Sequence, residues 1–85
     1  MNEAEIETAV LEVLTEVAPN VDVAGLDPKV AFHDQFEFDS LDFLNFVIAL
    51  GKRSGEEIPE IDYPKLASLQ GCIGYFAARE KSAVE

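Results

Sequence analysis

The sequence predicts an all-α fold, a small bundle of three main helices and one short helix. Apolar residues recur at helical spacing in three segments, and residues typical of helix starts and stops bracket each segment. No segment has the clean alternation of apolar and polar residues that is typical of a strand. The chain has 85 residues, enough for one domain, which we place at residues 1–85.

The first predicted helix covers residues 3–17. Asn2 and Glu5 have the spacing of a capping box, in which two side chains bond each other's backbone amides at the helix start. Pro19 and Asn20 follow the segment and end it. Its apolar residues at helical spacing are Ile6, Val10, Val13, Leu14 and Val17.

Residues 18–39 are predicted to form a long connection without a regular element. The segment contains Gly25 and Pro28 and is longer than a simple link between helices, so we expect it to be functional or partly packed. The apolar residues expected to hold it onto the core are Val21, Val23, Leu26, Phe32 and Phe36.

The second predicted helix covers residues 40–52. Ser40 stands at its start, where a serine is in most proteins an ordinary N-cap. Gly51, followed by Ser54 and Gly55, is expected to end it, and Lys52 and Arg53 suit the negative C-terminal end of a helix. Apolar residues cover most of its circumference, so the helix either lies centrally in the core or meets a partner.

The last part of the chain is predicted to contain a short helical turn and a third main helix. Asp62 is expected to cap the turn, with Pro64 in its first turn, where proline is tolerated. Ser68 is expected to cap a helix that runs to about residue 81. Cys72 lies on the apolar stripe of this helix, which favours a buried small hydrophobe over a reactive thiol.

Composition excludes several functional classes. The chain has 17 acidic and 6 basic residues and a net charge of −11, which disfavours nucleic acid and anionic membranes as partners. Cys72 is the only cysteine and no Asp-x-Asp-x-Asp-Gly loop is present, so we expect neither a disulfide nor a metal site. Without a signal-peptide pattern or an apolar run of roughly 20 residues, we expect a cytoplasmic monomer that does not insert into membranes.

The region around Ser40 resembles an acyl carrier protein. Asp39-Ser40-Leu41-Asp42 resembles the Asp-Ser-Leu signature that opens the second helix of that family. A match to three residues alone is weak, but flanking elements fall at the family's spacing without a gap. These elements are Phe32-His33-Asp34-Gln35-Phe36, Val47-Ile48-Ala49-Leu50, Ile58-Pro59 and Lys65-Leu66-Ala67-Ser68-Leu69.

The resemblance implies that Ser40 carries a 4′-phosphopantetheine arm, which a phosphopantetheinyl transferase moves from coenzyme A. The arm would hold acyl groups as thioesters for fatty-acid, polyketide or related lipid synthesis, so the protein itself would not be an enzyme. Loading and processing enzymes with basic docking patches would be the partners. Residues expected to dock are Glu37, Asp39, Leu41, Asp42, Phe43, Asn45 and Ile48. Residues expected to line an acyl cavity are Leu44, Phe46, Val47, Ile58, Ile73 and Phe76.

Three departures from the family's pattern suggest a specialised carrier with dedicated partners. Glu37 replaces a usual glycine, and its turn would be strained if it required a positive φ. Phe43 replaces a small polar residue and is expected to be a contact surface beside Ser40. Lys52 and Arg53 stand where acids are usual, and would repel a basic docking patch.

Two other functional classes remain as alternatives. An unmodified acidic helical adaptor would bind basic partners without any arm. A small enzyme is disfavoured, because the spacing of His33, Asp39 and Ser40 does not support a hydrolytic triad. Among carriers, Asp-Ser-Leu and the acidic surface favour acyl cargo over peptidyl cargo, and the sequence names neither the acyl group nor the pathway.

Overall fold

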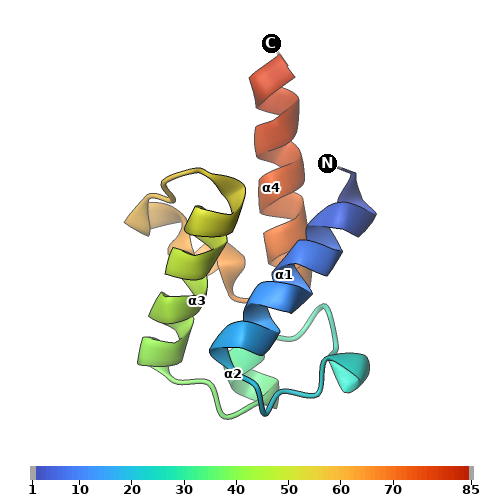
Figure 1. The fold of residues 1–85 in the computed structure, drawn as a ribbon, viewed down its shortest axis with the longest axis vertical. Coiled ribbons are helices and arrows are strands. Elements are labelled where there is room, and N and C mark those ends of the chain that lie inside the picture. Colours follow the sequence, from blue (N-terminus) through green and yellow to red (C-terminus); the bar gives the residue numbers. More distant parts are fainter. Residues whose placement is uncertain (1, 85) are drawn as a thin grey trace.

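Three long helices frame the molecule, as the sequence predicts. The computed structural model describes residues 2–84, and contains α1 (Glu3–Val17), α3 (Ser40–Ser54) and α4 (Leu69–Val84) (Figure 1). Helix α1 packs against both α3 and α4. The described residues contain no strand, so the all-α fold class is confirmed.

The segment between α1 and α3 contains two short elements that the sequence did not predict. A 3-10 helix, η1 (Val23–Gly25), and a four-residue helix, α2 (Phe32–Gln35), interrupt the expected irregular connection. The backbone amide of Phe32 donates to the carbonyl of Ala67 at 2.8 Å, and that of Gln70 donates to Pro28 at 2.9 Å. These bonds fasten the connection to the residues around the start of α4.

The ends of α1 and α4 follow local sequence signals. Asn2 and Glu5 form the predicted capping box at the start of α1. The hydroxyl of Ser68 accepts a hydrogen bond from the amide of Gly71 at 3.0 Å, which confirms its capping role. Helix α4 continues to Val84, three residues beyond the predicted end.

Two predicted caps are wrong. Asp39 caps α3 and Ser40 is the first helical residue, so the ordinary N-cap role considered for Ser40 does not apply. Asp62 does not begin a helical turn, because η2 (Glu60–Leu66) starts two residues earlier, after Pro59. Helix α3 ends at Ser54 rather than residue 52, and Gly55 closes it with a φ of 75°, the left-handed conformation that glycine adopts without strain.

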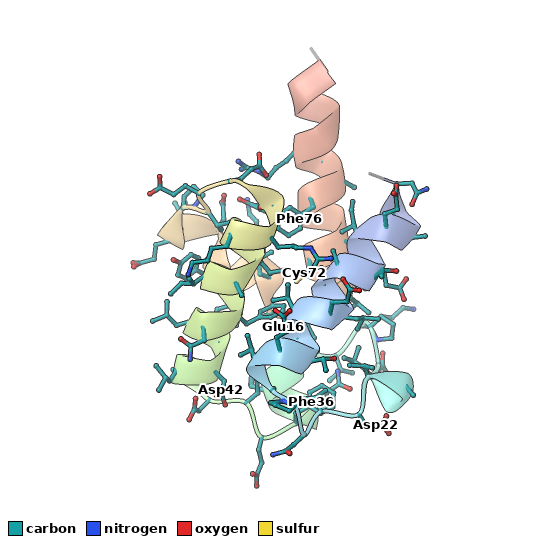
Figure 2. The ribbon with its side chains drawn as sticks, in the orientation of Figure 1. Glu16, Asp22, Phe36, Asp42, Cys72 and Phe76 are labelled. Atoms are coloured by element: carbon teal, nitrogen blue, oxygen red, sulfur yellow. The ribbon has the colours of Figure 1, made fainter. Side chains whose placement is uncertain are left out.

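The core is apolar and centred on packed aromatic rings. Phe46 makes edge-to-face contacts with Phe32, at 5.2 Å between ring centroids, and with Phe38, at 6.0 Å. Cys72 is buried among these helices, as predicted, and burial raises the pKa of its thiol to about 12 (Figure 2). The buried hydrophobic residues are Ile6, Val10, Val13, Leu14, Phe32, Phe38, Phe46, Val47, Leu50, Ile58, Leu66, Leu69, Cys72 and Phe76.

Candidate functional site

Ser40 occupies the first position of α3, and its hydroxyl has no structural task among the described residues. The N-cap is Asp39, whose carboxylate accepts a hydrogen bond from the amide of Asp42 at 2.9 Å. In return, the carboxylate of Asp42 accepts from the amide of Asp39 at 3.2 Å. Ser40 is exposed, and none of the hydrogen bonds within residues 2–84 uses its hydroxyl. The oxygen is therefore free to react.

The electrostatic surroundings of Ser40 contain opposing contributions. The first helical amides of α3, those of Ser40 and Leu41, have no backbone acceptor among the described residues, and the helix dipole places partial positive charge there. Both features stabilise a phosphate. The carboxylates of Asp39 and Asp42 adjoin the same end of the helix, as the position of Asp42 in Figure 2 shows, and they oppose an added negative charge.

A hollow of about 630 Å³ lies beside Ser40. It lies between the N-terminal end of α3, the segment that contains α2, and η2. Its walls are predominantly apolar, and its polar side chains are His33, Asp39, Ser40 and Tyr63. The lining residues are Phe32, His33, Phe38, Asp39, Ser40, Phe43, Tyr63, Pro64 and Ala67.

The outer face of α3 carries an exposed apolar stripe. Leu41 is 64% exposed, Leu44 41% and Ile48 46%, and their spacing of three and four residues places them on one side of the helix. Leu44 was predicted to line an internal cavity, but it lies on the same outward stripe as two predicted docking residues. Glu37, Asp39 and Asn45 are also exposed, whereas Asp42 and Phe43 are partly buried.

The other predicted cavity residues do not surround one space. Phe46 lies in the aromatic core and Ile73 is partly buried against the core. Val47 and Ile58 line a second hollow of about 460 Å³ together with Tyr63. Phe76 lines a separate groove of about 440 Å³, beside α1. Between residues 2 and 84 the six residues are thus distributed over the core, the outer face and two different hollows.

The basic pair Lys52 and Arg53 does not form a single patch. The guanidinium of Arg53 pairs with the carboxylate of Glu12 and so links α3 to α1. Lys52 is exposed and lines the second hollow. Among the described side chains of α3, Lys52 is therefore the one positive charge without an ion-pair partner at this end of the helix.

A separate polar network joins η2 to α4. The hydroxyl of Tyr75 donates to the carboxylate of Asp62 at 2.8 Å, and the guanidinium of Arg79 donates to the same hydroxyl at 3.1 Å. Arg79 also pairs with Glu56 at 3.1 Å. The hydrogen bond from Tyr75 is the main reason why the pKa of the Asp62 carboxyl is lowered, with a further contribution from Lys65.

Comparison with known proteins identifies the family. No family model matches the chain. It is 31% identical to an acyl carrier protein of Thermobifida fusca over 74 residues, which cover 87% of this chain and 92% of that protein. It is 28% identical to an acyl carrier protein of Acidothermus cellulolyticus over 98% of both chains. The chain belongs to the acyl carrier protein family.

A third relative extends the similarity beyond bacteria. Acyl carrier protein 2, mitochondrial, of Arabidopsis thaliana is 28% identical over 96% of this chain and 64% of its own length. Membership of the acyl carrier protein family supports a general role in carrying acyl groups. No helix within the described residues is long and apolar enough to cross a membrane.

The structure of this acyl carrier protein shows the backbone conformation at Glu37 and the contacts of His33. All non-glycine residues within residues 2–84 have a negative φ, so Glu37 occupies its turn without left-handed strain. His33 lies 3.4 Å from the carboxylate of Asp34 and is not hydrogen-bonded to Ser40, although both line the same hollow. The described residues thus contain no nucleophile–base pair of a hydrolytic triad, and no cluster of metal ligands.

Proposed function

We propose that this protein carries acyl groups as thioesters on a 4′-phosphopantetheine arm attached to the hydroxyl oxygen of Ser40. The observation that carries the proposal is the uncommitted hydroxyl of Ser40 at the first position of α3, beside a neighbouring residue that performs the capping. Family membership supports the same role. The protein supplies the attachment point and the recognition surface, and its partner enzymes perform the chemistry.

The attachment reaction requires a phosphopantetheinyl transferase and coenzyme A. The oxygen of Ser40 attacks the phosphorus next to the pantetheine, and a phosphodiester bond forms. The pyrophosphate bond breaks, adenosine 3′,5′-bisphosphate leaves, and a base of the transferase takes the hydroxyl proton. The orphan amides at the start of α3 stabilise the new anionic group, which is the contribution of this chain.

Incubation with coenzyme A and a broad-range transferase tests this proposal directly. The intact mass of the wild-type protein should rise by one phosphopantetheine group, and that of Ser40→Ala should not change. Ser54→Ala is the matched control, because Ser54 is the other serine of α3 and stands at its opposite end. No mass gain with several transferases would instead favour the unmodified acidic adaptor.

We further propose that the outer face of α3 is the docking surface. Leu41 is strongly exposed next to Ser40, and exposed carboxylates of Glu37 and Asp39 lie before it. An apolar centre with an acidic rim suits a partner that presents an apolar pocket and basic residues. Leu41→Asp should therefore slow arm transfer, whereas Ile61→Asp, at an even more exposed position on η2, should not. Equal rates for both variants would contradict this surface.

Dedicated partner enzymes form a further part of the proposal. Lys52 is exposed and places a positive charge near the docking surface, which repels a basic patch. Enzymes of a general fatty-acid system should therefore process the loaded protein poorly, and Lys52→Glu should improve their turnover. Arg53→Glu should not give the same gain, because that side chain pairs with Glu12. Wild-type turnover equal to that of a housekeeping carrier would remove this idea.

The remaining proposals concern organisation and cargo. We propose that the domain spans residues 1–85, acts as a cytoplasmic monomer and serves fatty-acid, polyketide or related lipid synthesis. The strongly acidic composition favours solubility and fast association with basic enzymes. Mass spectrometry of the thioester on the protein from its own host would identify the acyl group.

A further inference from the structure

The hollow beside Ser40 has aromatic walls that come from separate parts of the chain. Phe43 belongs to α3, Tyr63 to η2, and Phe32 and Phe38 to the segment before α3. Ser40 stands among these walls, so a group tethered to its oxygen starts at the hollow. A mainly apolar hollow of about 630 Å³ with a few polar side chains suits a small apolar ligand that carries a polar link.

The inner side of this hollow is closed by the core. Phe32 and Phe38 form part of its lining, and both pack edge-to-face against Phe46, which is fully buried. Phe32 and Phe38 also contact each other, at 5.6 Å between ring centroids. Protein cores are packed at the density of crystals, so a tethered chain cannot extend inward past these three rings without displacing them.

A second aromatic contact borders the hollow on the side of α3 and η2. Phe43 and Tyr63 meet edge-to-face at 6.4 Å between ring centroids, and they join α3 to η2. Tyr63 also lines the second hollow, where Val47 and Ile58 are found, whereas Phe43 lines the hollow beside Ser40 and not the second one. The contact between Phe43 and Tyr63 therefore lies at the border between the two hollows.

We propose that Phe43 and Tyr63 determine cargo length, by confining a short acyl group to the hollow beside Ser40 and excluding a longer chain from the hollow at Val47 and Ile58. This inference rests on the proposed function, because it requires an acyl group on the arm of Ser40. Phe43 then has an internal role, whereas its place beside Ser40 in the sequence predicted contact with a partner. The half-buried position of Phe43 against Tyr63 supports the internal role.

The test uses a series of straight-chain acyl groups, from acetyl to dodecanoyl, loaded onto the full-length protein from the corresponding acyl-coenzyme A. The mass spectrum reports loading, and the rate of thioester cleavage by hydroxylamine reports shelter. Burial of one methylene contributes about 0.8 kcal/mol, so the cleavage rate should fall by up to about fourfold for each carbon that enters a hollow. In the wild-type protein this protection should stop increasing at a short chain.

Phe43→Ser and Tyr63→Ala should both extend the protection to longer chains. Phe36→Ser is the matched control, because it also removes a half-buried phenylalanine near the core but lies outside the hollow beside Ser40. That control should keep the wild-type limit. Each cleavage rate is referred to the acetyl form of the same variant, so a general loss of stability cancels.

Methyl NMR spectra supply a second readout. A short acyl group on the wild-type protein should shift the methyl resonance of Ala67, which lines the hollow beside Ser40, and should leave those of Val47 and Ile58 in place. A long chain on Phe43→Ser should shift the resonances of Val47 and Ile58. These shifts are independent of any enzyme.

The possible failures are distinguishable. A protein that cannot be loaded at Ser40 overturns the proposed function together with this inference. A loaded wild-type protein whose protection rises steadily to dodecanoyl overturns the length limit alone. The same limit in the wild type and in both aromatic variants overturns the assignment of Phe43 and Tyr63.

Discussion

Removing the cap of α3 is the sharpest test of how the site is built. Asp39→Ala deletes the carboxylate that accepts the amide of Asp42 at 2.9 Å, and it also breaks one half of a reciprocal pair. Loss of an aspartate N-cap costs about 1 kcal/mol, within a range of about 0.5–2 kcal/mol. For a domain of this size, 1 kcal/mol lowers the Tm by about 4–8 °C.

Ser40→Ala should behave differently, although the two residues are adjacent. The hydroxyl of Ser40 makes no hydrogen bond within the described residues, so its removal breaks nothing. Alanine is also the better helix former, by up to about 0.7 kcal/mol. The unmodified Ser40→Ala protein should therefore equal or slightly exceed the wild type in stability.

Urea denaturation of the unmodified proteins, followed by circular dichroism, measures both effects. The free energy of unfolding should fall for Asp39→Ala and should not fall for Ser40→Ala. A loss of about 1 kcal/mol in Ser40→Ala with no loss in Asp39→Ala would show that the serine is the cap. The hydroxyl of Ser40 would then be engaged in a capping hydrogen bond and would not be free to react.

Three further predictions concern the rest of the fold. Burial raises the pKa of the Cys72 thiol to about 12. The neutral thiol therefore stabilises the fold below the ordinary thiol pKa, and this contribution is lost as the pH rises toward 12. A disulfide reagent at pH 8 should react with Cys72 only after unfolding, and rapid reaction with the native protein would contradict the burial. The hydrogen bond from Tyr75 lowers the pKa of the Asp62 carboxyl. The ionised carboxylate therefore stabilises the fold above the ordinary carboxyl pKa, and this contribution is lost as the pH falls through the lowered pKa. In Tyr75→Phe the Asp62 carboxyl should titrate at higher pH, as followed by carbon NMR, and an unchanged titration would show that Tyr75 does not cause the shift. Gly71→Ala should lower the Tm, because the new methyl group would collide with a backbone carbonyl of η2. Gly74→Ala, where nothing lies within 4 Å of the added group, should instead stabilise α4 by about 0.5–1 kcal/mol. The reverse order of stabilities would refute the close packing of α4 against η2 at Gly71.

Local signals predicted the starts of α1 and α4, but the caps predicted at α3 and η2 were wrong. Asn2 with Glu5, and Ser68, act through residues three positions away, so the sequence alone contains the information. At α3 both Asp39 and Ser40 are good caps. Asp42, three residues after Asp39, decides between them, although a capping box more often has Glu or Gln at that position.

Features that depend on contacts between distant segments could not be predicted. Helix α3 is apolar on most sides, so periodicity did not reveal that Leu44 faces outward while Phe46 faces the core. The four-residue helix α2 is too short for a periodic pattern. Arg53 pairs with Glu12, which is 41 residues away in the sequence, and no pattern on α3 itself indicates that contact.

Tertiary packing also decides which of two neighbouring phenylalanines is buried. Phe36 was expected to hold the connection onto the core and does pack against it, whereas Phe38 was not singled out from the sequence. In the structure Phe38 is buried against Phe32 and Phe46, and Phe36 is only partly buried. The two residues are two positions apart and chemically identical, so only the path of the backbone decides between them. This choice also shapes the hollow beside Ser40.

The central claim is that Ser40 bears the phosphopantetheine arm, and peptide mass spectrometry of the protein purified from its own host tests it most directly. The account predicts a phosphopantetheine group on the peptide that contains Ser40, with or without an acyl thioester at its end. A protein that carries an unmodified serine at this position under every growth condition would contradict the account.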